Sequence, residues 1–288
     1  MQEYQEYIEK AKILVEALPY IKEFNGKTVV IKYGGSALVE GAVRDTVMQD
    51  IALMKLVGIR PVVVHGGGPE INAMLKRLGV EPAFLNGLRV TDGQTMEIVE
   101  MVLAGKINKD ITTELQMQGI KAAGISGKDG GTLRAKKKAA QGADLGFVGE
   151  ISAVDTGLLT ALIERDFVPV VSSVAMGEEG QSYNINADYA AVSVAVALSA
   201  EKLVFLTDVP GILERAGDEN SLLSEIGADA LEAMIRSGEI TGGMIPKATC
   251  AIDATRAGVK NVHVLDGRTE HCLLLEIFTK YGIGTMVK

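Results

Sequence analysis

The sequence alternates short apolar runs with longer stretches in which apolar residues recur every three or four positions, and this alternation constrains the fold most. Apolar, mostly β-branched runs predict strands at 28–32, 61–65, 168–171, 203–206 and 262–265. Helical periodicity predicts helices at 43–57, after Pro69, and at 187–200, 228–237, 247–257 and 271–278. Strands separated by helices favour an α/β fold, with a mostly parallel central sheet covered on both faces.

Two segments depart from this alternation. Between Gly130 and Ile151, glycines and alternating residues predict hairpins that form a lid. Before the first strand, one apolar stripe predicts a helix of roughly 22 Å that precedes the sheet. The helix either packs on the chain's own sheet or pairs with the helix of a neighbouring subunit. The stripe consists of Tyr4, Tyr7, Ala11, Leu14 and Leu18.

Composition and charge exclude several functional classes. The formal net charge of -8 disfavours a nucleic-acid partner, which would favour a basic surface. Cys250 and Cys272 lack metal-ligand spacing, so we predict no protein metal site. The acidic N-terminal stretch does not match a signal peptide, and the longest apolar stretch, 190–200, is shorter than the ~18 residues of a membrane span. We therefore expect a cytoplasmic or organelle-stromal protein without a membrane partner.

Two of the predicted strands end in glycine clusters. Gly34-Gly35 follows the strand that ends at Lys32, and 66–68 is a run of three glycines directly after His65. At the carboxyl ends of parallel strands, glycines allow backbone N–H groups to approach a phosphate closely. Each cluster alone is also typical of a tight turn between a strand and a helix. Neither matches a P-loop or a dinucleotide-binding fingerprint.

Several polar residues stand at positions where packing alone does not call for them. Lys32 ends a buried run, although lysine is rarely buried without a partner. The segment 184–188 (NINAD) opens an apolar helix with Asp188 in its first turn, where one capping residue would suffice. Arg89 has the planar fork that binds a carboxylate through two hydrogen bonds. The alternatives are a lysine at the sheet rim, simple helix capping and a surface ion pair.

The second half of the sequence carries two further loops of this kind. Residues 207–211 (TDVPG) form a Pro-Gly turn after a predicted strand, which either serves only as a turn or contacts a nucleotide. Gly242-Gly243 precedes Lys247, at the start of a predicted helix. A cation at that end of a helix opposes the helix dipole, which suggests a bound anion nearby or a solvated side chain.

Seven motifs are spread over nearly the whole chain: IKYGG at 31–35, VVVHGGGP at 62–69, NGLRVT at 86–91, PVVSS at 169–173, NINAD at 184–188, LTDVPGIL at 206–213 and GGMIPK at 242–247. In these motifs the chain resembles the amino-acid kinase family, and within it the members that phosphorylate N-acetyl-L-glutamate. The resemblance implies a three-layer α-β-α sandwich of the amino-acid kinase or carbamate kinase-like type. It also implies an N-terminal helix at 1–20, an acyl-amino-acid-binding and dimerisation lobe at 21–178 and an ATP-binding lobe at 179–288.

The resemblance also implies site residues. Lys32 and Lys247 would stabilise the transferring phosphoryl group, Asp188 would orient both lysines, and backbone N–H groups would be donated by Gly35, Gly67 and Gly68. N-acetyl-L-glutamate would be held by Gly67, Gly68, Arg89, Asn184 and Asn186. ATP would be bound by Gly34, Gly35, Thr207, Asp208, Gly211, Leu213, Thr241, Gly243 and Lys247. Mg²⁺ would enter with ATP rather than in a cage of protein carboxylates.

A narrower resemblance joins the N-terminal helix with the tail at 271–286. Both resemble the arginine-inhibited, hexameric branch of the family, in which N-terminal helices interlace neighbouring dimers into a trimer of dimers. The L-arginine contacts implied by that match are Tyr20, Lys202, His263, Glu276 and Gly282. A signalling protein of the PII type is a further possible partner in such a branch.

The expected reaction is the ATP-dependent formation of N-acetyl-L-glutamyl 5-phosphate in arginine biosynthesis. A γ-carboxylate is already ionised at pH 7, so the reaction requires positioning and charge stabilisation rather than a general base. Two alternatives compete with this expectation. One is a kinase of the same fold for glutamate, aspartate, carbamate or a nucleoside monophosphate. The other is a non-catalytic arginine or nucleotide sensor, which would be expected to lack Lys32, Asp188 or Lys247.

Overall fold

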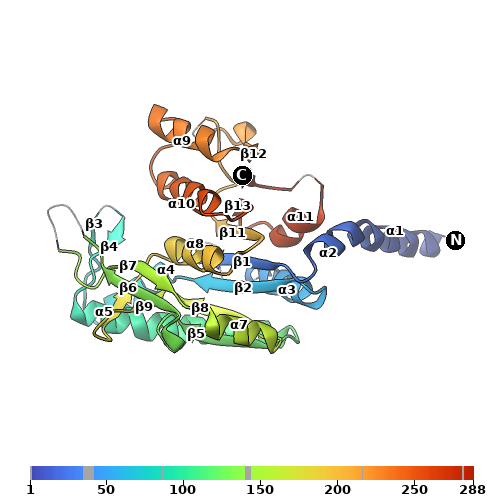
Figure 1. The fold of residues 1–288 in the computed structure, drawn as a ribbon. Coiled ribbons are helices and arrows are strands. Elements are labelled where there is room, and N and C mark those ends of the chain that lie inside the picture. Colours follow the sequence, from blue (N-terminus) through green and yellow to red (C-terminus); the bar gives the residue numbers. More distant parts are fainter. Residues whose placement is uncertain (1, 35–41, 86, 140–143, 216, 281) are drawn as a thin grey trace.

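A largely parallel sheet runs through the middle of the computed structural model, which describes residues 2–34, 42–85, 87–139, 144–215, 217–280 and 282–288 (Figure 1). Within these ranges its strands are β1 (Thr28–Tyr33), β2 (Arg60–His65), β5 (Ala122–Ser126), β8 (Val168–Ser172), β11 (Lys202–Thr207), β12 (Glu225–Ile226), β13 (Asn261–Asp266) and β14 (Thr285–Val287). The spatial order is β12-β14-β13-β11-β1-β2-β8-β5. Only the β13–β14 pair of this sheet is antiparallel in the described chain.

Helices cover both faces of this sheet. One face carries α7 (Gly157–Glu164), α8 (Ala187–Ala197) and α10 (Met244–Arg256), with α9 (Ala228–Ser237) packed on α10. The other face carries α3 (Ala42–Leu56), α4 (Gly68–Arg77), α5 (Gly93–Glu100), the π-helix η2 (Met101–Ile107), α6 (Asn108–Met117) and α11 (Cys272–Phe278). Short 3₁₀ turns are η3 (Asp129–Gly131) and η4 (Glu219–Ser221).

The strand pleat divides the hydrophobic core into two clusters. Val30, Val62 and Val64 belong to the cluster under α8 and α10, whereas Val29 and Val63 belong to the cluster under α3 and α6. Neighbouring residues of a strand point to opposite faces, so a strand buried on both faces reads as a continuous apolar run. The expected three-layer α-β-α sandwich is confirmed.

Two smaller sheets lie beside the main one. A sheet of β6 (Leu133–Lys137), β7 (Gly149–Val154), β9 (Val174–Met176) and β10 (Ser182–Asn184) has the order β10-β9-β6-β7. A two-stranded ribbon consists of β3 (Phe84–Leu85) and β4 (Leu88–Arg89). β6 and β7 form the hairpin expected between Gly130 and Ile151. The predicted division at 178/179 stays a prediction, and β9 and β10 pair as a hairpin across it.

The predicted strands and most predicted helices are present, but some boundaries were wrong. α10 begins at Met244, three residues before the predicted start, so Lys247 is its fourth residue. α8 ends at Ala197 because Ser199 takes a positive φ of 48° and ends the helical backbone. The helical stretch 93–117 was not predicted, because a π-helical segment in its middle interrupts the period of 3.6.

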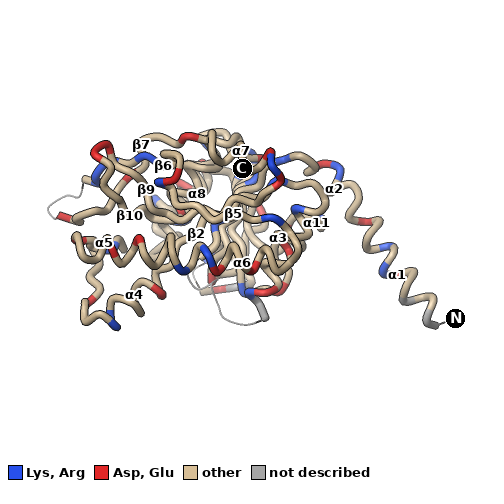
Figure 2. Tube along the Cα trace, turned by 90° about the horizontal axis from the view of Figure 1, so that it is seen from below, with Lys and Arg blue, Asp and Glu red and all other residues tan. Residues whose placement is uncertain are grey.

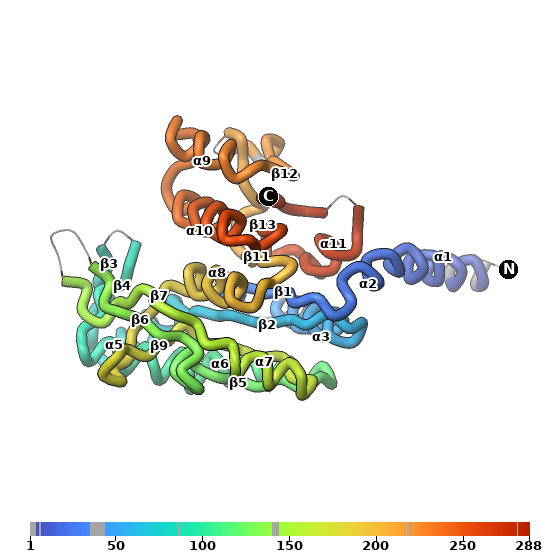
Figure 3. The backbone as a smooth tube through the Cα atoms, viewed as in Figure 1, coloured from blue at the N-terminus to red at the C-terminus, as the bar shows by residue number. Residues whose placement is uncertain are grey.

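The N-terminal helix projects from the body of the molecule (Figures 1 and 3). It consists of α1 (Gln2–Glu16), followed by α2 (Leu18–Phe24), which packs against α11. Four stripe residues are exposed: Tyr4 at 76%, Tyr7 at 62%, Leu14 at 71% and Leu18 at 55%. The apolar stripe of the N-terminal helix therefore does not pack on the chain's own sheet, which was one of the two alternatives.

Charges of both signs are interspersed along the described trace (Figure 2). This arrangement agrees with the absence of like-charge blocks in the sequence. In the described part of the chain, no helix combines the length and the hydrophobicity that crossing a membrane requires.

Candidate active site

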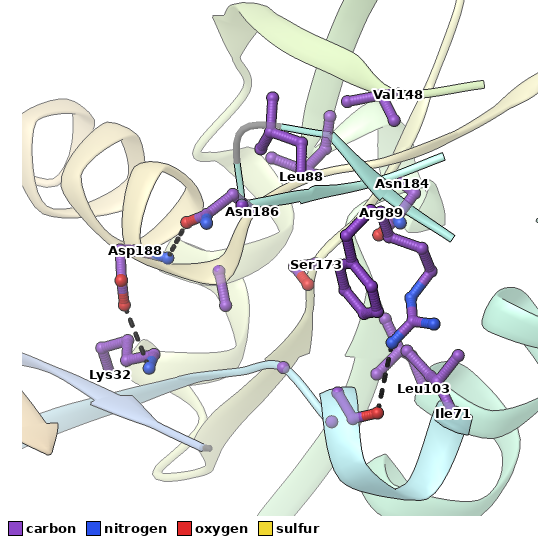
Figure 4. A pocket seen from close by; sticks show the side chains of 17 residues that line it. Lys32, Ile71, Leu88, Arg89, Leu103, Val148, Ser173, Asn184, Asn186 and Asp188 are labelled. Atoms are coloured by element: carbon purple, nitrogen blue, oxygen red, sulfur yellow. Dashed lines mark hydrogen bonds and ion pairs between the residues drawn. The ribbon is translucent and has the colours of Figure 1, made fainter. Parts of the chain in front are cut away.

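The predicted substrate residues meet at one edge of the main sheet. β1, β2 and β8 are neighbouring parallel strands, and their carboxyl ends meet the first turn of α8. Ligands of open α/β sheets bind at this edge. A cavity of about 210 Å³ lies here (Figure 4). Among its lining residues are Lys32, Gly66, Gly67, Gly68, Phe84, Arg89, Ser173, Asn184, Asn186 and Asp188.

Lys32 and Asp188 form an ion pair at one end of this cavity (Figure 4). Lys32 Nζ lies 3.0 Å from Asp188 Oδ1, and the two side chains are only 11% and 13% exposed. The contact lacks the alignment of a hydrogen bond, so Asp188 Oδ1 keeps an unfilled acceptor position. A buried ion pair is costly to desolvate, which makes a role in binding or orientation a better explanation than stability alone.

The first turn of α8 is held by Asn186. Its side-chain oxygen accepts hydrogen bonds from the backbone N–H groups of Asp188, at 2.9 Å, and Tyr189, at 3.4 Å. This is an N-cap, so the simple interpretation of Asn186 is correct. Asn186 also lines the cavity, as the substrate prediction requires. The cap fixes the backbone from which the Asp188 carboxylate reaches Lys32.

The two glycine turns pack against each other and against helix side chains. Gly34 has a φ of 151°, and a Cβ there would lie 3.2 Å from the backbone nitrogen of Gly66. A Cβ on Gly67 would lie 2.0 Å from the Ile107 side chain. Neither position accepts a larger residue unless its neighbours move. Both positions therefore require glycine because other atoms lie so close to the backbone. Gly35 lies outside the described residues.

Arg89 lies at the opposite end of the cavity from Lys32 (Figure 4). Its Nη2 donates to the carbonyl oxygen of Gly68 at 3.2 Å, whereas Nη1 is buried without a hydrogen-bond partner in the described chain. Burial lowers the pKa of Arg89. Asn184 lies on β10 and donates from Nδ2 to Thr91 Oγ1 at 3.1 Å. A buried guanidinium with an unfilled donor edge is suited to a carboxylate.

A second cavity, of about 480 Å³, collects part of the predicted nucleotide site. Asp208, Gly211, Leu213 and Thr241 line it. Thr207 is buried and does not line this cavity. Its hydroxyl accepts a hydrogen bond from Val209 N at 3.2 Å and lies 3.0 Å from the carbonyl oxygens of Val209 and Leu265. Thr207 therefore shapes the turn.

Gly34, Gly243 and Lys247 line neither of these two cavities. Gly243 directly precedes α10, and Lys247 is half-buried in its first turn. The thiol of Cys250, one turn further, lies within electrostatic reach of Lys32, Asp188 and Lys247. The pKa of that thiol is raised to about 12, chiefly by burial and then by the charge of Asp188, with the two lysines acting in the opposite direction. Lys247 therefore lies on the same side of the sheet as the Lys32–Asp188 pair, within the electrostatic range of a common neighbour.

All five predicted arginine contacts line one further cavity of about 410 Å³, between α2 and α11. Lys202 Nζ lies 3.1 Å from His263 Nε2, and His263 Nδ1 lies 2.6 Å from Glu276 Oε1. Burial is the largest single influence and opposes the ionisation of Glu276, but His263 and the backbone N–H groups of Ile283 and Gly284 together outweigh it and hold the pKa of the carboxyl below its usual value. Tyr20 and Gly282 complete the set.

Two groups of residues were missed by the sequence predictions. Ser173 lines the first cavity after β8, and the PVVSS motif could have indicated it. His65, directly before the three glycines, is fully buried and bonds to Asn108 of α6. Asn108 Nδ2 also lies 3.1 Å from Ile125 O and 2.9 Å from Val170 O, which ties three strands together. No local pattern in the sequence indicates such a contact.

A model of the amino acid kinase family matches residues 27–266. The chain belongs to the amino acid kinase family. Among its relatives, an acetylglutamate kinase from Heliobacterium modesticaldum is 55% identical over 289 residues, which cover 97% of this chain and 98% of the relative. The similarity to this relative therefore extends over nearly the whole chain and is not confined to the central sheet.

Solved structures with a similar fold support the assignment to this family. N-acetylglutamate synthase from Neisseria gonorrhoeae, complexed with coenzyme A and N-acetyl-glutamate, matches with a TM-score of 0.85 and 28% identity. This chain covers 63% of that synthase, and the match takes in 96% of this chain. The same synthase complexed with coenzyme A and L-arginine matches with a TM-score of 0.80. Giardia carbamate kinase, at 18% identity and a TM-score of 0.66, shows likeness of fold alone to this amino acid kinase.

Among the described residues, no group of three or more His, Cys, Asp or Glu side chains could hold a metal ion. Asp188, the acid nearest Lys32, is already paired with that lysine.

Proposed function

We propose that this protein transfers the γ-phosphoryl group of ATP to the γ-carboxylate of N-acetyl-L-glutamate. The observation that carries the proposal is the cavity with the Lys32–Asp188 pair at one end and the unfilled guanidinium edge of Arg89 at the other. N-acetyl-L-glutamate has a carboxylate at each end, which matches this separation of cationic groups. The acetylglutamate kinase relative at 55% identity supports the same substrate.

In the proposed reaction, an oxygen of the γ-carboxylate bonds to the γ-phosphorus as the bond from phosphorus to the ADP oxygen breaks. The carboxylate is ionised near neutral pH, so no proton has to be removed. His65, the histidine nearest the glycine turn, is unsuitable as a base. Its Nδ1 lies 3.0 Å from the acceptor Gly66 O, and burial lowers its pKa to about 4.

The chain's own groups then have distinct tasks. Arg89 and Asn184 hold the α-carboxylate end, and the glycine turn at 66–68 offers backbone N–H groups beside the transferring group. Lys32 and Lys247 stabilise negative charge on the phosphoryl oxygens, and Asp188 holds Lys32 in position. The cavity at 208–213 and Thr241 receives the nucleotide. Because the geometry is set before ligands bind, catalysis rests on positioning and charge.

The test is ADP release with ATP, Mg²⁺ and N-acetyl-L-glutamate. We expect turnover that requires the acetylated substrate, with L-glutamate and L-aspartate at least tenfold poorer in kcat/KM. Formation of an acyl phosphate is checked by trapping the product with hydroxylamine as a hydroxamate. Absence of turnover in the folded protein, or a preference for an unacetylated acid, would reject the substrate assignment.

We also propose that L-arginine inhibits the enzyme by binding in the cavity between α2 and α11. The cavity offers Glu276, whose pKa is held below its usual value, for a guanidinium, and the amino group of Lys202 for a carboxylate. The L-arginine complex of the related synthase is consistent with this class of ligand. A hexamer built through the exposed α1, and docking of a PII-type protein, are further parts of this proposal. Loss of inhibition in Glu276→Gln, with activity retained, is the expected result.

A further inference from the structure

The β3–β4 ribbon places an aromatic ring directly opposite Arg89. Phe84 and Arg89 are cross-strand partners in the antiparallel register, with Leu85 opposite Leu88. The guanidinium carbon of Arg89 lies 4.8 Å from the centroid of the Phe84 ring. Both side chains line the substrate cavity. Cross-strand partners on one face of a ribbon have neighbouring Cβ atoms, so this contact is built into the register.

The guanidinium of Arg89 is held by few other groups. Arg89 is 8% exposed, yet only its bond from Nη2 to Gly68 O is formed, and Nη1 is buried without a partner in the described chain. A single hydrogen bond from Nη2 leaves the plane of the guanidinium free to rotate about that nitrogen. The face of an aromatic ring restricts that rotation and attracts the cation.

Phe84 itself has little other reason to be where it is. Its side chain is 54% exposed, on a ribbon whose strands have two residues each. Isolated ribbons of this length are marginally stable. The ribbon is extended by a hydrogen bond from Val90 N to Ala83 O at 2.9 Å and attached to α4 by the Arg89–Gly68 contact. The ring thus adds little to the core and covers one face of the guanidinium.

We propose that Phe84 is a positioning residue for Arg89: its ring holds the guanidinium in the orientation that receives the α-carboxylate of N-acetyl-L-glutamate at this end of the cavity. The inference rests on the proposed function for the identity of that carboxylate. It assigns Phe84 to substrate binding through Arg89 and not to phosphoryl transfer, because Lys32 lies at the other end of the cavity (Figure 4).

The kinetic test replaces Phe84 by leucine, which keeps an apolar side chain but removes the ring face. We expect Phe84→Leu to raise KM for N-acetyl-L-glutamate roughly threefold to tenfold, the effect of losing one cation–π contact. The kcat and the KM for ATP stay within twofold. Phe84→Tyr keeps the wild-type KM, because tyrosine presents a similar ring face. A wild-type KM in Phe84→Leu, or an equal rise in Phe84→Tyr, overturns the proposal.

A double-mutant cycle separates positioning from direct contact. In an Arg89→Gln background, Phe84→Leu should lower kcat/KM by less than twofold, because no guanidinium remains to be oriented. An additive loss would show that the ring contacts the substrate itself, which contradicts the proposal. The matched control is Phe167→Leu, which removes another ring–cation pair, with Lys121 Nζ 5.9 Å from the ring, before the amino end of β8. It should leave KM unchanged.

A spectroscopic test needs no substrate. The Nε–Hε resonance of Arg89, assigned by its loss in Arg89→Lys, should show a ring-current shift in the ligand-free protein. We expect Phe84→Leu to abolish that shift and Phe167→Leu to leave it. If the chemical shift of the Arg89 resonance is the same in wild type and Phe84→Leu, the positioning role is rejected. If the resonance responds but N-acetyl-L-glutamate is not a substrate, the proposed function has failed while the Phe84–Arg89 geometry stands.

Discussion

Lys32 is the single residue on which the catalytic proposal depends most directly. It is 3.0 Å from Asp188 and nearly buried. We expect Lys32→Ala and Lys247→Ala each to lower kcat on the order of 10²–10³-fold, the effect typical of removing one donor to developing charge. Lys32→Met keeps the bulk of the side chain and should show the same loss. Steady-state ADP release and circular dichroism measure activity and folding, and wild-type turnover in any of these folded variants refutes the assignment.

The pH dependence of stability should reveal His65. Its pKa is lowered from 6.5 to about 4, so the unfolded chain binds the proton more readily. The neutral ring therefore contributes stability that is complete above pH 6.5 and is lost as pH falls toward 4, on the order of 3 kcal/mol. Urea unfolding between pH 4 and 7.5 should show a shallower acid decline in His65→Gln than in wild type. Parallel declines would contradict this account.

At the residue scale, the sequence is most informative where a residue type is unusual for its position. Lys32 at the end of an apolar run and Asp188 in an apolar helix are polar residues that packing does not require, and the structure pairs them. Asn108 was missed because its partners come from β2, β5 and β8, far apart in the sequence. Ser173 was missed as an individual residue because a serine after a strand is common.

Among the elements, α11 depends on a side chain from α3. Asp50 is fully buried, with Oδ1 2.7 Å from His271 Nδ1 and Oδ2 accepting from Leu273 N at 3.2 Å, so it caps α11. We expect Asp50→Ala to lower the free energy of unfolding by about 1–3 kcal/mol, through the lost cap and the unpaired N–H. Urea denaturation measures the loss. Asp45→Ala, an exposed acid on the same helix, is the control and should change stability little.

Elements were predictable where periodicity is regular. β1, β2, β8, β11 and β13 are apolar on both faces, so composition alone indicated them. β5 was not predicted because its sequence, AAGIS, is weakly strand-forming. Its Gly124 is required by packing, since a Cβ there would lie 2.1 Å from Asn108 Oδ1. The π-helix η2 was missed because its wider turn interrupts the period of 3.6 residues.

For the whole molecule, the exposed apolar stripe of α1 predicts assembly. We expect light scattering to give a mass several times that of the 30.5 kDa chain, and removal of residues 2–16 to reduce it. Leu14→Asp should act in the same direction, because it places a charge on the stripe. Lys12→Gln, which alters an exposed ion pair with Glu9, is the control. An unchanged mass after removal of α1 would exclude this helix from the interface.

The place of β1 in the sheet has a consequence for biosynthesis. β1 begins at residue 28, yet one of its two neighbours, β11, begins at residue 202. At about 5–20 residues per second, the ribosome needs on the order of ten to thirty seconds to make the intervening chain. During that interval β1 has an open edge, which is a site for wrong pairing. Slowed translation before residue 202 should therefore favour aggregation, and binding of chaperones to the nascent chain should counter it.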